Sequence, residues 1–107
     1  MKALWISLAL MLPLAAVAEV PDDAVWIDVR SQQEFDSGHL EGAKHIPWDG
    51  IEKGVEALQL EKDQAIYLYC GSGGRAGKAE ARLEALGYSA IVNAGGLGDA
   101  RALLGEK

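Results

Sequence analysis

The chain contains a single cysteine, Cys70, which is followed by a loop rich in glycine. Four of the eight residues from Cys70 to Gly77 are glycine, and Arg75 lies among them. Because glycine has no Cβ, successive backbone N–H groups can turn towards one point and form a site for an anion. A cysteine held there should have a lowered pKa and should act as a thiolate nucleophile near neutral pH. We therefore predict covalent chemistry at Cys70, with Arg75 adding a positive charge at the rim of the loop.

The length of this loop distinguishes between possible reactions. Arg75 follows Cys70 with four residues between them, and phosphatase-type cysteine loops are longer by one residue. The tighter ring suits a smaller target than a phosphate, such as the terminal sulfur of a persulfide. This argues against a cysteine phosphatase or arsenate reductase. A thiol oxidoreductase is disfavoured as well, because the chain offers no second cysteine.

Short apolar segments alternate with helical ones and must position this loop. We expect strands over residues 25–29, 43–46, 65–69 and 89–93. Two helices are predicted to begin at capping boxes, one at residues 31–34 and one at residues 49–52. The helix after the loop should end at Gly87. Gly95–Gly96 is expected to be a loop before a closing helix over residues 100–104.

Apolar positions in the two longer predicted helices should form their inner faces. These positions are Ile51, Val55 and Leu58 in the first helix and Ala79, Leu83 and Leu86 in the second.

Strands that alternate with helices favour an α/β fold, with a small parallel sheet of about four strands and helices on both faces. Cys70 follows the strand predicted over residues 65–69. Open α/β sheets bind ligands at the carboxyl ends of their strands. The fold class therefore places the cysteine loop where a binding site is expected.

The first residues have the composition of a secretory signal peptide. Lys2 is followed by a mainly apolar run over residues 3–14, and Ala16 and Ala18 are the small residues that a signal peptidase recognises. The run is shorter than the roughly 18 to 20 apolar residues that a membrane span needs. We expect cleavage after Ala18, which leaves residues 19–107 as a single periplasmic or secreted domain.

The composition excludes several classes of function. The formal net charge is −6, which argues against binding nucleic acid or an anionic membrane surface. The sequence has no His/Cys cluster with zinc-site spacing and no phosphate-binding loop of the GxxxxGK[ST] type. We therefore predict neither a metal nor an organic cofactor.

Motifs over residues 25 to 97 resemble the rhodanese family, most closely its small exported single-domain members of the phage-shock type. The first signature comprises Ile27-Asp28-Val29-Arg30, Glu34-Phe35, Gly38-His39-Leu40, Gly42-Ala43 and Ile46-Pro47. The active loop is matched by Cys70, Ser72, Gly73 and Arg75, and a further glycine pair by Gly95-Gly96.

This resemblance implies a role for each matched residue. Cys70 would form the persulfide, and Arg75 would order the loop and attract anions. The cradle for the sulfur would be the backbone of Gly71, Ser72, Gly73, Gly74 and Ala76. Asp28 and Arg30 would support the loop through structure and charge.

The chain also departs from the family pattern. His45 stands where the family usually has asparagine, Ala76 where serine is frequent, and the usual first strand is absent. These departures concern substrate preference more than the reaction. His45 could tune Cys70, and Trp48 could line the pocket, whereas His39 is expected to bond only to local backbone.

The reaction implied by the resemblance is a double displacement. Cys70 takes the outer sulfur of thiosulfate or a similar donor, and cyanide or a thiol accepts it. An alternative is a persulfide carrier or binding module that does not turn over but delivers sulfur to a protein partner. The same loop would serve both, and steady-state turnover would distinguish them.

Overall fold

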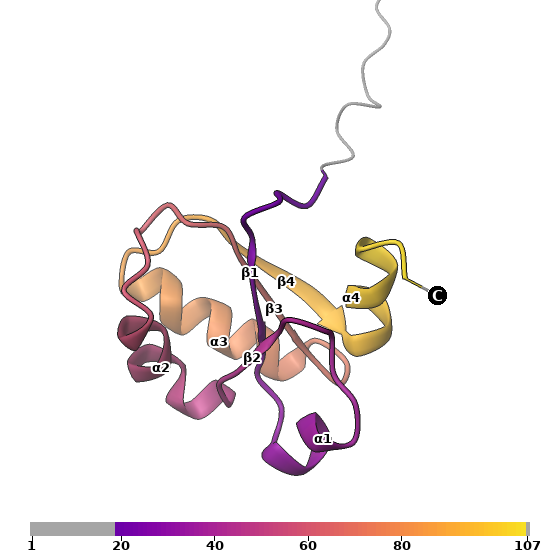
Figure 1. Ribbon diagram of the computed structural model, residues 1–107. Coiled ribbons are helices and arrows are strands. Elements are labelled where there is room, and N and C mark those ends of the chain that lie inside the picture. Colours follow the sequence, from indigo (N-terminus) through magenta and orange to yellow (C-terminus); the bar gives the residue numbers. More distant parts are fainter. Residues whose placement is uncertain (1–18, 107) are drawn as a thin grey trace, which may run out of the picture.

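A computed structural model describes residues 19–106 of the chain. It has a four-stranded sheet in the order β2-β1-β3-β4, with every neighbouring pair parallel. Figure 1 shows helices on both sides of this sheet. The elements are β1 (Val25–Asp28), α1 (Gln32–Asp36), β2 (Lys44–His45), a 3-10 turn (Trp48–Gly50), α2 (Ile51–Ala57), β3 (Ile66–Cys70), α3 (Gly74–Ala85), β4 (Ile91–Gly96) and α4 (Leu97–Leu103). The predicted α/β class, strand number and parallel pairing are confirmed.

The register of the sheet brings the chemistry-bearing residues to one edge. Asp28 at the end of β1 pairs with Tyr69 of β3 and with His45 of β2. Cys70 at the end of β3 pairs with Gly96 at the end of β4. Because all the strands are parallel, these carboxyl ends lie at the same edge of the sheet, where ligands bind in open α/β folds.

Each face of the sheet has its own apolar core. On one face α2 and α3 pack through Ile51, Val55, Ala79 and Leu83, all fully buried. On the other face Ala100 of α4 packs with a second cluster of buried residues. That cluster also contains Leu40, Tyr67, Tyr69 and Ala94. Every residue of β3 is buried, so the strand that carries Cys70 is fixed from both sides.

The helix at α1 begins as predicted. The Ser31 hydroxyl accepts from the Glu34 backbone N–H, and the Glu34 carboxylate accepts from the Ser31 N–H, which completes the capping box. The second predicted capping box is wrong. There the chain forms the 3-10 turn, and Gly50 caps α2 without any side-chain bond. The Glu52 carboxylate instead contacts Arg82 of α3 at 3.4 Å.

Two further details of the predicted elements are corrected. β4 does not end at Asn93 but continues through Gly95 and Gly96, with a register shift between Leu68 and Cys70 of β3. Leu86 is 36% exposed rather than inward-facing. It is the C-cap of α3, which ends at Ala85, so it no longer follows the helical periodicity.

The predicted signal peptide, residues 1–18, lies outside the described residues. Within residues 19–106, no helix has both the length and the apolar character needed to cross a membrane.

Candidate active site

The Cys70 sulfur lies under the turn that joins β3 to α3. The residue is 1% exposed, and the Gly73 N–H donates a hydrogen bond to Sγ at 2.9 Å. Gly73 has φ +106°, a conformation that side-chain-bearing residues rarely adopt, so glycine is required there. Gly73 is also the N-cap of α3, which places the unpaired amides of the first helical turn beside the sulfur.

Opposing effects set the ionisation of this thiol. Burial raises the pKa of Cys70, because a thiolate loses hydration inside the protein. The backbone amides of Ala76, Ser72, Gly73 and Arg75 act in the other direction, and together they leave the pKa below its ordinary value. The positive end of the α3 dipole has the same sign of effect. The loop can therefore hold an anionic sulfur without a metal or a second titrating group.

Of the predicted cradle residues, Ser72, Gly73 and Ala76 direct backbone amides at the sulfur, and the Arg75 amide joins them. Gly71, Ser72 and Gly74 are exposed, Gly73 is half-buried and Ala76 is fully buried against the α3 side of the sheet. What Ser72 and Ala76 provide to the sulfur is a backbone amide, not a side-chain group. A change of side chain at these positions therefore leaves the donor in place, provided that the backbone keeps its path.

Arg75 does not offer a free charge at the rim of the loop. Its guanidinium donates two hydrogen bonds to Glu34 of α1, from Nη1 to Oε1 at 2.7 Å and from Nη2 to Oε2 at 3.1 Å. The hydrogen bond from Arg75 lowers the pKa of Glu34 to about 2, and Glu34 in turn raises the pKa of Arg75. The ion pair ties the loop to α1 and offsets much of the Arg75 charge that was expected to attract anions.

Glu34 is a site residue that the sequence interpretation assigned only to the capping box and the family signature. One carboxylate oxygen, Oε1, accepts bonds from Ser31 and from Arg75. The capping box fixes Glu34 on the first turn of α1, and this orientation lets it meet a loop that lies 41 positions further along the chain. The capping box gives no indication of that long-range partner.

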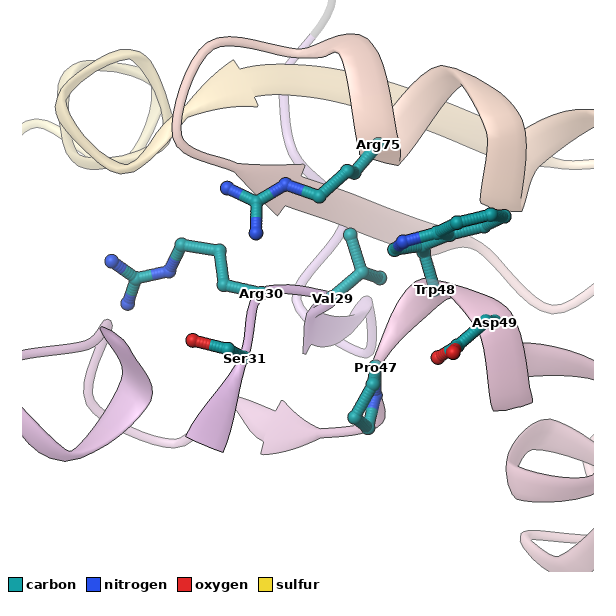
Figure 2. A pocket seen from close by; sticks show the side chains of 7 residues that line it. All are labelled: Val29, Arg30, Ser31, Pro47, Trp48, Asp49 and Arg75. Atoms are coloured by element: carbon teal, nitrogen blue, oxygen red, sulfur yellow. The ribbon is translucent and has the colours of Figure 1, made fainter. Parts of the chain in front are cut away.

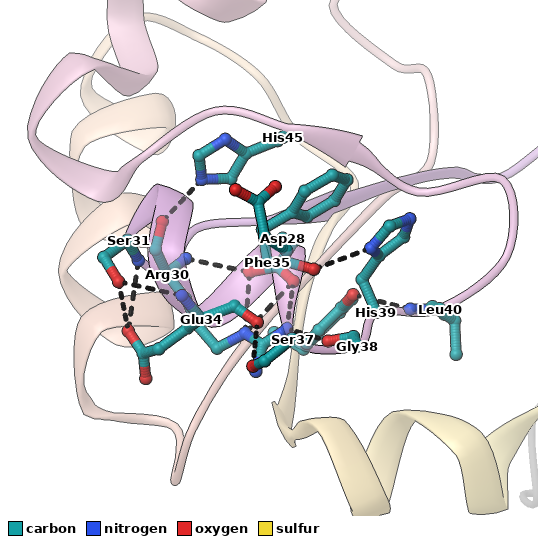
Figure 3. A network of polar contacts seen from close by, with 12 residues as sticks. Asp28, Arg30, Ser31, Glu34, Phe35, Ser37, Gly38, His39, Leu40 and His45 are labelled. Atoms are coloured by element: carbon teal, nitrogen blue, oxygen red, sulfur yellow. Dashed lines mark hydrogen bonds and ion pairs between the residues drawn. The ribbon is translucent and has the colours of Figure 1, made fainter.

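Asp28 and Arg30 form a buried ion pair at the end of β1. Arg30 Nη2 lies 2.6 Å from Asp28 Oδ2 and also donates to the Gly38 carbonyl at 2.7 Å. The guanidinium lies over the ring of Tyr69, 5.6 Å from its centroid. Figure 3 shows Arg30 between Asp28 and Gly38. Together with the contact to Tyr69, these interactions connect β1, β3 and the segment after α1. Their geometry fits the supporting role that the resemblance implies.

The two histidines lie on either side of Phe35. Its ring stacks on His39 at 3.6 Å and on His45 at 4.7 Å between centroids. His39 Nδ1 lies 2.8 Å from the Phe35 carbonyl, the local backbone bond that was predicted. His45 Nε2 lies 2.7 Å from the carbonyl oxygen of Arg30. Figure 3 shows the ring turned towards this carbonyl. His45 therefore supports the backbone that leads into α1, and its ring contacts Arg30 and Phe35 rather than Cys70.

A pocket of about 250 Å³ opens beside the loop. Figure 2 shows Arg75 and the Trp48 ring on one side of it, with Ser31 and Pro47 opposite. The Trp48 ring is in turn held by two cations of α3, with Lys78 Nζ at 5.0 Å and Arg82 Cζ at 4.9 Å from its centroid. Trp48 thus lines this pocket, a position that the sequence left open. Residues 19–106 contain no group of three His, Cys, Asp or Glu side chains that could hold a metal ion.

Comparison with known proteins gives one consistent family. The model of the rhodanese-like domain matches residues 14–101. Thiosulfate sulfurtransferase PspE of Escherichia coli (strain K12) is 34% identical over 91 residues, which cover 83% of this chain and 88% of that protein. The tRNA uridine(34) hydroxylase of Enterobacter sp. (strain 638) is 40% identical over 73 residues, but these are only 21% of its length.

Solved structures agree with this assignment. A rhodanese with anions from E. coli has a TM-score of 0.68 and 33% identity, covering 71% of this chain and 89% of that one. A rhodanese-like domain of the Alr3790 protein from Anabaena sp. has a TM-score of 0.67 and 26% identity, covering 78% of this chain and 94% of that domain.

Proposed function

The chain belongs to the rhodanese-like domain family, and on that basis we propose that it is a sulfurtransferase that carries sulfur as a persulfide on Cys70. The observation that carries this proposal is the loop itself. A buried sulfur accepts from the Gly73 amide at 2.9 Å, and the backbone donors around it lower its pKa. Such a site favours a thiolate before the reaction and a persulfide anion after it. PspE, which has the related sequence, is named a thiosulfate sulfurtransferase, and we propose thiosulfate as the donor here.

The proposed reaction consists of two displacements. In the first, the Cys70 thiolate attacks the outer sulfur of thiosulfate, the sulfur–sulfur bond of the donor breaks, and sulfite leaves with the bonding electron pair. In the second, a thiolate or cyanide attacks the outer sulfur of the Cys70 persulfide, and the original thiolate is released. Electrons balance in both steps, so no external oxidant or reductant is required. The loop amides face a sulfur anion in both resting states and need little rearrangement between them.

The residues around the loop would divide the remaining work. Arg75 and Glu34 hold the loop against α1, and Asp28 and Arg30 hold the end of β1 beside it. The pocket bounded by Trp48 would receive the acceptor, since Arg75 of the active loop forms part of its wall. A small thiol, or a cysteine side chain of a protein partner, would approach from this side.

We further propose that the protein acts outside the cytoplasm after cleavage of residues 1–18. The support is the composition of this segment, with Lys2 before an apolar run and Ala16 and Ala18 at its end. N-terminal sequencing of the protein from the expressing cell should give Glu19 as the first residue. Recovery of the intact chain with Met1 would contradict this part of the proposal.

Mass spectrometry after exposure to thiosulfate tests the reaction directly. The protein should gain the mass of one sulfur atom, mapped to Cys70, and lose it again on addition of cyanide. Cys70→Ser should gain nothing and should lose turnover, with an unchanged circular dichroism spectrum. Turnover that persists in Cys70→Ser would refute the proposal. A persulfide that forms but supports no steady-state turnover with cyanide or a small thiol would instead identify a sulfur carrier.

A further inference from the structure

Asn93 of β4 connects two backbone segments that meet beside Cys70. Its side-chain Nδ2 donates to the Gly73 carbonyl at 3.0 Å, and its Oδ1 accepts from the Gly95 N–H at 2.9 Å. One bond needs a donor and the other an acceptor, so the amide is satisfied in only one orientation. Asn93 therefore links the active loop to the glycine pair at the end of β4.

Gly73 needs this kind of external support. It has no side chain that could be packed, it has φ +106°, and glycine moves easily between backbone conformations. Its N–H is the group that donates to Cys70 Sγ. Its carbonyl accepts from Asn93 and from the Gly77 N–H at 2.9 Å, the first bond of α3. With the carbonyl held by two donors, the residue has little freedom to turn its amide away from the sulfur.

The neighbouring glycines bring β4 close enough for this contact. A Cβ on Gly73 would lie 3.5 Å from the Gly95 Cα, and a Cβ on Gly77 would lie 3.5 Å from Asn93 Nδ2. The Gly96 N–H is in turn held by Asp99 Oδ2 at 2.8 Å, which anchors the end of β4 to α4. Asn93 thus joins a strand fixed by α4 to the residue that donates to the nucleophile.

We propose that Asn93 is a positioning residue, which holds the Gly73 amide on the Cys70 sulfur through the Gly73 carbonyl. This inference adds to the proposed function a residue outside the loop, whose side chain reaches the sulfur only through the backbone. Since the Gly73 amide is among the donors that lower the pKa of Cys70, removal of the Asn93 amide should raise that pKa.

The test compares two substitutions of Asn93 with one matched control. Asn93→Ala removes both bonds. Asn93→Asp keeps the shape and the acceptor for Gly95 but places a carboxylate oxygen against the Gly73 carbonyl. Asn93 is exposed, so neither change empties the core. The control is Gln64→Ala, because the Gln64 amide also donates to backbone carbonyls, those of Asp23 at 2.8 Å and Ala65 at 3.2 Å, at the opposite end of the sheet.

The measurement is the pH dependence of Cys70 alkylation by iodoacetamide, which does not require sulfurtransferase activity. Both Asn93 variants should have their midpoint at higher pH than the unmodified protein, with Asn93→Asp displaced further because it adds a negative charge. Below the original midpoint, alkylation of Asn93→Ala should be slower by about tenfold, equivalent to about 1.4 kcal/mol. Gln64→Ala should keep the original profile.

Two results would overturn the inference. The first is an unchanged alkylation profile in Asn93 variants that circular dichroism shows to be folded. The second is a midpoint pH that shifts as far in Gln64→Ala as in Asn93→Ala, because general loosening of the sheet would then explain both shifts. Because the assay reports only the thiol, it remains decisive if thiosulfate proves not to be a substrate.

Discussion

Gly96 lies where β4 passes closest to the active loop, and it has no room for a side chain. A Cβ at this position would collide with the carbonyl oxygen of Gly71 and would lie 3.0 Å from its carbonyl carbon. Both of these atoms belong to the backbone, so no rotamer change can relieve the contact. Gly96 itself has φ −93° and ψ 177°, an extended conformation that alanine adopts freely. Any effect of Gly96→Ala is therefore steric and comes from the loop.

The expected loss of activity in Gly96→Ala depends on which part of the loop is displaced. Gly96 pairs with Cys70, and Gly71 follows Cys70 directly, so relief of the collision displaces the peptide next to the nucleophile. A displacement on the order of 1 Å at an active site costs on the order of 100-fold in rate. Overpacking of a buried position costs about 1–3 kcal/mol of folding free energy. We therefore expect Gly96→Ala to fold with reduced stability and to lose most of its sulfur transfer.

Gly98 provides a matched control two residues further on. A Cβ there meets nothing within 4 Å, and the residue lies inside α4. Gly98→Ala should keep full activity and raise the free energy of unfolding by up to about 1 kcal/mol, because alanine has a higher helix propensity than glycine. The assays are urea denaturation and kcat/KM with thiosulfate and cyanide. Wild-type kcat/KM in Gly96→Ala, or an equal loss in Gly98→Ala, would refute the steric reasoning.

Two further predictions concern charge. Glu34→Gln should lower activity by loosening the loop while keeping α1, because glutamine also completes a capping box. The substitution should lower the free energy of unfolding by at most about 1 kcal/mol, since the Glu34 and Arg75 side chains are both more than a third exposed. The pKa of Glu34 is lowered to about 2, so its ion pair stabilises the fold above the ordinary carboxyl pKa and is lost as pH falls towards about 2. In urea denaturation, Glu34→Gln should lack this acid dependence of stability. The control Glu52→Gln, which breaks the pair to Arg82, should retain it and keep full activity. The reverse result would contradict the role given to the Glu34–Arg75 pair. Moderate salt should leave thiosulfate turnover unchanged or raise it, measured as kcat/KM against sodium chloride concentration, whereas a steep fall would show that long-range attraction dominates.

Local sequence patterns were sufficient for most of the fold. β3 follows from a run of apolar residues, and the α1 capping box depends only on Ser31 and a glutamate three positions later. The box predicted at Asp49 has the same spacing but fails, because Asp49 lies within the 3-10 turn and the N-cap of α2 is Gly50. The Glu52 carboxylate contacts Arg82 of α3 instead, and a partner 30 positions away cannot be read from a pattern of four residues.

The end of β4 was mispredicted for a related reason. Two consecutive glycines are typical of a loop, yet Gly95 and Gly96 are part of the strand. Gly96 is needed there because the Gly71 carbonyl leaves no room for a Cβ. Gly95 is needed because it has φ +84°, and because a Cβ on it would lie 2.6 Å from Asp99 Oδ2. The requirement at Gly96 comes from the neighbouring segment, so it becomes visible only once β3 and β4 are paired.

The charges around Cys70 explain why the shape of the loop matters more to this site than net charge does. Arg75 is paired with Glu34 and Arg30 with Asp28, so the two arginines that line the pocket are largely neutralised by partners. The sulfur anion then depends on backbone dipoles, whose effect falls off within a few ångströms, whereas a full charge acts over about 10 Å at moderate salt. A net acidic protein can hold an anionic intermediate in this way, provided that the amides stay aligned. Gly96 maintains that alignment from the β4 side of the loop, and Asp99 of α4 holds the Gly96 N–H in place. We therefore expect substitutions in β4 to affect the reaction as strongly as substitutions beside the sulfur.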